Sequence, residues 1–119
     1  MDSSEKFERG CSHFNRGEYF EAHEVWEDLW HIADGPRHSY LQGLIQIAAA
    51  LHHAKNENYN GTRKLFARAL GYLEKVGTNR FEIDLGVLTQ NVLAFEIAIQ
   101  SILEGKEVPL PFFLLPRNQ

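Results

Sequence analysis

The chain has 119 residues, of which 44% are hydrophobic and 24% are charged, and its formal net charge is −4. This length suits one domain with a core of its own, and the composition excludes a disordered chain. The acidic balance argues against nucleic acid as a partner, because binding to phosphates requires a basic face.

Helical periodicity runs through most of the sequence, and no segment shows the alternation typical of a strand. The third expected helix is apolar almost all round from Leu41 to Leu51, so it should be the central one. Three of the four prolines fall in the last eleven residues, which excludes a helix there. The expected helices cover a short segment from Phe7 to Phe14 and then approximately 18–33, 36–56, 60–76 and 84–104.

The second and fourth expected helices resemble each other. The stretch 17–27 has the pattern of the inner helix of a tetratricopeptide repeat, and large side chains recur at matching places forty residues later. We therefore expect an all-α bundle of about five helices, built from two stacked helical hairpins, as one domain over 1–119. Residues 106–119 should form an extended apolar tail packed on the bundle. The matching pairs are Tyr19 with Tyr59, Trp26 with Phe66 and Trp30 with Leu70.

Compartment and partners follow from the same simple features. The single cysteine, Cys11, cannot form an internal disulfide, and the polar start of the chain lacks the apolar core of a signal peptide. No apolar stretch is judged long enough to span a membrane. We expect a cytoplasmic protein that has no membrane partner.

One run on the second helix carries candidate chemistry. His23, Glu27 and Trp30 share a helix face, because their spacing is i, i+4 and i+7. An imidazole and a carboxylate one turn apart can reach one divalent cation, as the two histidines of an HExxH motif do. Glu24 lies beside them as a candidate general base, and both Trp26 and Trp30 are interpreted as core aromatic residues.

The third helix offers partners for this face. Gln42, Gln46 and His53 form a polar stripe on an otherwise apolar helix, and His52 lies at its edge. Antiparallel pairing would bring the start of the second helix close to the end of the third. His52 or His53 is therefore the candidate third ligand of a divalent metal ion held by His23 and Glu27.

Two classes of function remain open from the residues. One is a metal-dependent site, hydrolytic in its strongest form, with Glu24 as base. The other is a non-enzymatic helical-hairpin module that binds a peptide or protein, in which the histidine and carboxylate are a structural tie. A homodimer is one way to cover the apolar tail.

Around these residues the chain resembles a known family. The motif HxxxExx(W/Y), present here as His23, Glu27 and Trp30, resembles that of a bacterial and archaeal family called domain of unknown function family 309. The resemblance covers roughly 14–75, including Leu41 to Gln46 and Ala50 to His52. It implies an all-helical bundle and a proposed metal-binding role for His23 and Glu27.

Overall fold

The computed structural model describes residues 2–77 and 80–119 and confirms an all-α protein with five helices. Among the described residues, β-structure is limited to one isolated bridge between Ile83 and Arg117. The chain divides into two compact units, Met1–Gly77 and Thr78–Gln119, and each is described by itself. The helices are α1 (Ser3–Asn15), α2 (Tyr19–Ile32), α3 (Gly35–Lys55), α4 (Tyr59–Leu73) and α5 (Leu85–Leu103).

Helix ends follow local chemistry. The Asp84 side chain accepts a hydrogen bond from the backbone N–H of Val87 at 3.1 Å, which confirms Asp84 as the N-cap of α5. Helix α4 ends at Leu73, earlier than the predicted end near Val76. The cause is a change of hydrogen bonding, because the N–H of Val76 bonds to the carbonyl of Leu73, three residues back.

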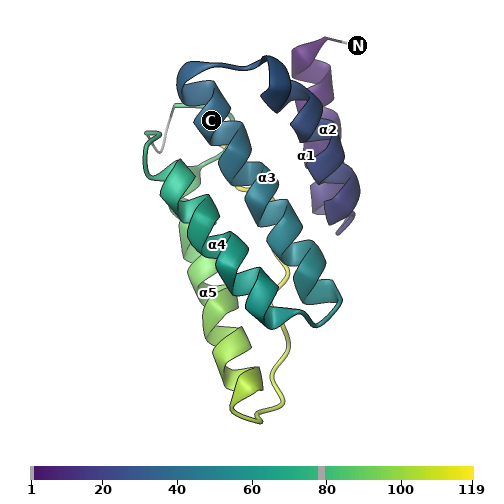
Figure 1. Cartoon of the computed structure of the whole chain (residues 1–119), viewed down its shortest axis with the longest axis vertical. Helices are drawn as coiled ribbons and strands as arrows, with labels where there is room; N and C mark the ends of the chain where they lie inside the picture. Colours follow the sequence, from purple (N-terminus) through teal and green to yellow (C-terminus); the bar gives the residue numbers. More distant parts are fainter. Residues whose placement is uncertain (1, 78–79) are drawn as a thin grey trace. The chain divides into compact units, whose positions relative to one another are not determined.

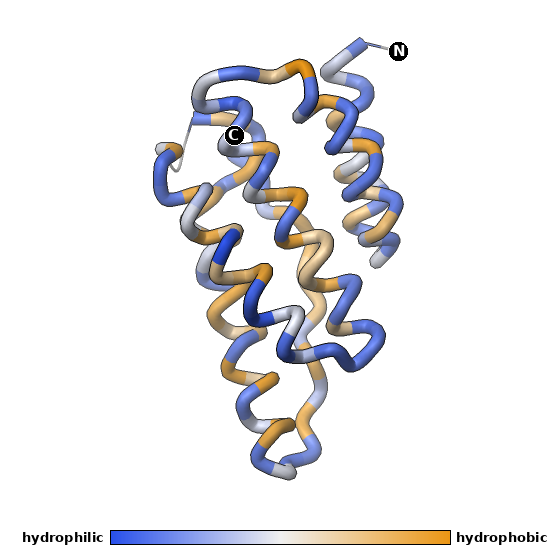
Figure 2. The backbone as a smooth tube through the Cα atoms, viewed as in Figure 1, coloured by the Kyte–Doolittle hydropathy of each residue, from blue (hydrophilic) through white to orange (hydrophobic). Residues whose placement is uncertain are grey.

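Helix α3 is the centre of the first unit. It lies between α2 and α4 (Figure 1). It buries more residues than any of the other four helices, as its apolar sequence predicts. Gly43 lets α4 approach, because a Cβ at this position would overlap the side chain of Leu73. The turn that leads from α3 into α4 is a continuous hydrophilic stretch (Figure 2).

Helices α2 and α3 are antiparallel. The rings of Trp30 and His38 stack near the short connection between the helices, with centroids 4.7 Å apart. At the far end the rings of Phe20 and His52 lie 5.6 Å apart. These two contacts confirm the predicted register, in which the start of α2 lies beside the end of α3. The pairing of α4 with α5 as a second hairpin stays a prediction, because these helices belong to different units.

The second unit consists of α5 and a tail that returns to its start. The backbone N–H of Asp84 donates to the carbonyl of Pro116 at 2.8 Å, and the bridge from Ile83 to Arg117 lies next to it. The side chains of the tail alternate in burial: Leu115 is buried, whereas Phe112 and Leu114 are exposed. Part of the apolar tail is therefore exposed. The packing of the tail on the bundle and the organisation as one domain stay predictions.

One expectation about the membrane was wrong. Helix α5 has 19 residues and a mean hydropathy of 1.3 over its most apolar window, so it meets the length and composition of a membrane span. That finding is weak evidence, since a core helix of a soluble protein meets the same test. Length and composition therefore do not decide whether α5 is a core helix, and the cytoplasmic location stays a prediction.

Candidate functional site

The motif residues of α2 begin with a paired histidine and glutamate. His23 Nε2 lies 3.1 Å from Glu27 Oε2, one helical turn away. Both side chains are partly exposed, at 28% for His23 and 43% for Glu27. The i, i+4 spacing alone positions this pair, because both residues project from the same helix face.

The pair lies at the level of the glutamines of α3. Between the contact of Trp30 with His38 and that of Phe20 with His52, the antiparallel register places Gln42 and Gln46 opposite the stretch from Glu27 to His23. We call His23, Glu27, Trp30, Gln42 and Gln46, which lie at corresponding levels of the two helices, the polar cluster.

Three buried atoms of the polar cluster lack hydrogen bonds. They are His23 Nδ1, Trp30 Nε1 and Gln46 Oε1, and none has a partner in the part of the chain that the structure describes. Two of the three belong to the sequence motif itself. An unsatisfied buried polar group costs about 1–3 kcal/mol, so a water or a ligand that bonds to these atoms would stabilise the fold.

The two histidines of α3 are placed differently from the polar cluster. Phe20 lies between His52 and His23, with ring centroids 5.6 Å from the first and 6.0 Å from the second. His53 Nδ1 accepts a hydrogen bond from Asn58 Nδ2 at 3.2 Å, at the turn that leads into α4. The structure thus brings His23 and Glu27 together and leaves His52 one aromatic ring away.

A divalent metal ion fits this donor set poorly. Among residues 2–77 and 80–119, no three His, Cys, Asp or Glu side chains are grouped so that they could hold one ion. A protein zinc site normally has three or four such ligands. His23 and Glu27 supply two, and the described residues supply no third.

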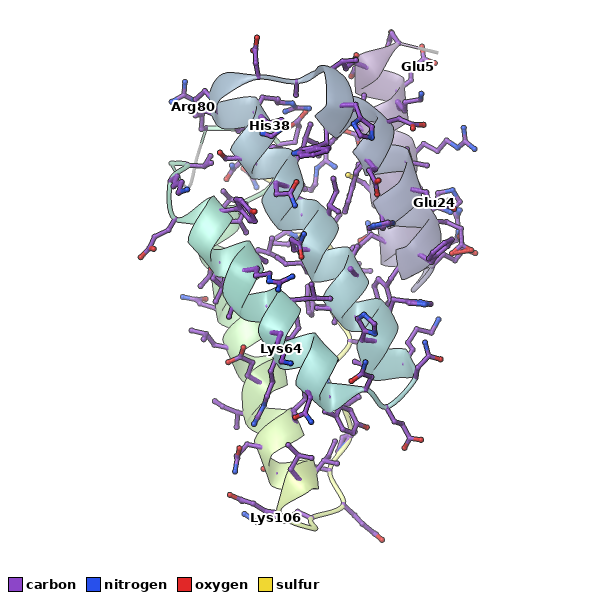
Figure 3. The ribbon with its side chains drawn as sticks, in the orientation of Figure 1. Glu5, Glu24, His38, Lys64, Arg80 and Lys106 are labelled. Atoms are coloured by element: carbon purple, nitrogen blue, oxygen red, sulfur yellow. The ribbon has the colours of Figure 1, made fainter. Side chains whose placement is uncertain are left out.

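The other predicted residues have clear places. Glu24 is exposed on α2 (Figure 3) and lines a surface groove with residues of α1 and with His23 and Glu27. Trp26 is fully buried, which confirms it as a core aromatic residue. The centroid of its ring lies 6.0 Å from the ring centroids of Phe7 and Phe14.

Sequence reasoning missed His38. Its ring stacks on Trp30 at an interplanar angle of 29°, so it closes one end of the polar cluster. The signal was present in the sequence, because His38 precedes Gln42 by four residues and continues the polar stripe of α3 by one turn.

Two shifted pKa values lie at the turn from α1 into α2. Hydrogen bonds from His13 and then from Arg16 hold the pKa of the Glu18 carboxyl below its ordinary value. Burial raises the pKa of the neighbouring Tyr19 hydroxyl. Glu18 forms hydrogen bonds at this turn and Tyr19 is buried beside it, so neither group belongs to the polar cluster.

Comparison with known sequences bears on the same residues. The model of a family described as "Domain of unknown function (DUF309)" matches residues 7–65, which include the whole polar cluster. The chain belongs to this family. It is also similar to the "Uncharacterized protein YpuF" of Bacillus subtilis (strain 168), with 32% identity over 98 residues. That match covers 79% of this chain and 56% of YpuF, so the chain spans about half the length of this curated relative.

Proposed function

We propose that this member of the DUF309 family is a binding protein whose polar cluster holds a small polar molecule between α2 and α3. The observation that supports the proposal is the set of three buried atoms without partners, on His23, Trp30 and Gln46. Two of the three residues belong to the HxxxExx(W/Y) motif. A buried water would satisfy the same atoms, and it is the structural alternative to a ligand.

The chemistry of the three atoms restricts the ligand. Trp30 Nε1 only donates a hydrogen bond, and Gln46 Oε1 only accepts one. His23 Nδ1 accepts a hydrogen bond in one tautomer of the neutral ring and donates one in the other. The ligand must therefore offer an acceptor to Trp30, a donor to Gln46 and a polar group to His23. Hydroxyl, amine and amide compounds meet this demand, whereas a fully ionised phosphate or carboxylate does not.

Metal-dependent hydrolysis is the second candidate, and one distance favours it. His23 Nε2 and Glu27 Oε2 are 3.1 Å apart, so one cation could contact both. Completion of the site by His52 or His53 would require a different position of either ring, since Phe20 and Asn58 now contact them. Glu24 lines the same groove as His23 and Glu27, and its role as base stays a prediction.

The test identifies what the untagged protein carries after purification. Native mass spectrometry of the intact chain, followed by analysis of the released small molecules and by elemental analysis, distinguishes the candidates. We expect a stoichiometric organic molecule in the wild-type protein and its loss in Trp30→Phe, which removes the indole N–H donor and keeps an aromatic ring. Retention of the molecule by Trp30→Phe, a stoichiometric metal or only water would contradict the proposal.

A further inference from the structure

A groove on the first unit runs between α1 and α2, on the side where Glu24 lies. Its volume is about 650 Å³, and its two walls come from the two helices. The wall from α1 is basic, with Lys6, Arg9 and His13. The wall from α2 is acidic, and its residues include Glu21, Glu24 and Asp28.

The charges on the two walls lie at matching levels. On each helix the three residues follow the spacing i, i+3 and i+7, so each set forms one row along its helix. The ion pair between Lys6 Nζ and Asp28 Oδ2, at 3.5 Å, sets the antiparallel register of α1 and α2. In that register Arg9 is level with Glu24, and His13 is level with Glu21.

These charges are only partly used within the chain. His13 is bonded to Glu18 at 2.8 Å and not to Glu21. Neither Arg9, Glu21 nor Glu24 takes part in an ion pair or hydrogen bond with any residue that the structure describes. Arg9 and Glu24 are both exposed, so the middle level of the groove presents one free charge of each sign.

We propose that this groove is the interface of a homodimer, in which a second copy of the chain is the occupant. A two-fold axis parallel to α1 and α2 places α1 of one copy over α2 of the other. Each residue keeps its height along the helix axis, so residues at the same height in the two copies face each other. Arg9 then faces the partner's Glu24, and the same pair occurs again by symmetry. A two-fold axis perpendicular to the helices within the interface would instead place basic wall on basic wall. The charge pattern therefore selects one symmetry.

The size of this surface sets the strength of the dimer. Helices α1 and α2 have 13 and 14 residues. At 1.5 Å per residue and about 10 Å per helix width, they present a projected face of roughly 400 Å². Two such faces give a total of about 800 Å², below the about 1,200 Å² of standard specific interfaces, so the dimer should be weak and reversible and should weaken further with salt. Phe20, 48% exposed and lining the same groove, supplies an apolar anchor.

Charge exchange between the walls tests the interface. In Arg9→Glu the symmetric contacts become glutamate against glutamate, and in Glu24→Arg they become arginine against arginine. Each variant alone should dimerise about tenfold or more weakly than the wild type at low salt. A mixture of the two variants restores both contacts with opposite signs, and so does the double variant R9E/E24R.

The measurement is sedimentation equilibrium of the full chain over a concentration series at low and high salt, with circular dichroism to verify the fold. We expect a salt-sensitive wild-type dimer, two weakened single variants, and a dimer in the mixture and in the double variant. A wild-type protein that stays monomeric at low salt would overturn the proposal. Single variants that dimerise like the wild type, or a mixture that stays monomeric, would overturn it as well.

Discussion

Trp26 donates its indole N–H to the backbone carbonyl oxygen of Phe7 at 3.2 Å, and this buried hydrogen bond joins α2 to α1. Both side chains are fully buried, and their rings stack with centroids 6.0 Å apart. Gly10 follows Phe7 by one turn, and a Cβ there would overlap the indole ring. The close packing of α1 on α2 therefore depends on a glycine within a helix, a position where glycine is otherwise unfavourable.

The first prediction concerns this glycine. We expect Gly10→Ala to lower the free energy of unfolding by about 1–3 kcal/mol, because the indole of Trp26 must move and its hydrogen bond to Phe7 is strained. Urea unfolding followed by tryptophan fluorescence measures the change. Gly71→Ala is the matched control, since a Cβ there meets no atom within 4 Å. Its better helix propensity should raise stability by about 0.5–1 kcal/mol. Equal shifts in both variants would contradict the packing argument.

The second prediction concerns the tail of the second unit. Leu115 is 4% exposed, and the chain beside it bonds to the start of α5 through Pro116 and Asp84. We expect Leu115→Ala to lower the free energy of unfolding by about 2–5 kcal/mol. Phe112→Ala is the control, because Phe112 is 63% exposed and its removal should change stability by less than about 0.5 kcal/mol. A docked tail is refuted if the two variants melt alike.

The helices were predictable from sequence because their signals are local. Apolar side chains at helical spacing predict all five helices, and Asp84 in the sequence predicts the start of α5 as its N-cap. The end of α4 was less predictable, since the switch to hydrogen bonds three residues back depends on backbone geometry after Leu73. The packing of the tail depends on pairing between residues more than thirty positions apart, such as Asn118 with the carbonyl of Phe81, which no local pattern records.

The candidate site was predictable only within one helix. His23 and Glu27 pair because their spacing alone brings them together. The partners on α3 depend on how each helix is rotated about its axis, and periodicity does not fix this rotation to within one side chain. His53 illustrates the difference: Asn58, which caps α4, also bonds to its imidazole. That contact depends on the α3–α4 turn rather than on the spacing along α3.

The third prediction concerns pH and the turn between α1 and α2. The hydrogen bond from His13, and then that from Arg16, lower the pKa of Glu18 from the ordinary value of 4.5. Since the pKa is lower in the folded than in the unfolded state, the stabilisation is complete above the ordinary value and is lost as the pH falls through the lowered one. Glu18→Gln should therefore be less stable than the wild type at pH 7, and the difference should narrow in acid.

Thermal melts across this pH range measure the effect of Glu18. The control is Glu21→Gln, because Glu21 has no ion-pair partner among the residues that the structure describes. Its melting curve should follow that of the wild type at every pH. A gap between Glu18→Gln and the wild type that stays constant into strong acid would show that the carboxylate does not stabilise the turn through its charge.

The last prediction uses Gln46 to distinguish a filled polar cluster from an empty one. Gln46 Oε1 is buried and has no partner in the described chain, so Gln46→Met removes an unsatisfied acceptor while keeping the size of the side chain. In protein that has been unfolded, freed of small molecules and refolded, this variant should be more stable than the wild type by about 1 kcal/mol. In protein as purified, the variant loses a hydrogen bond to the ligand and should melt at a lower temperature.

Gln42→Met is the control, because Gln42 lies one turn away on the same stripe and has no buried oxygen without a partner among the described residues. It should change stability little in either preparation. The stability of Gln46→Met relative to the wild type reverses its sign between the two preparations only if a ligand is lost on unfolding. An ordered water returns on refolding, so the stability difference would then have the same sign in both preparations.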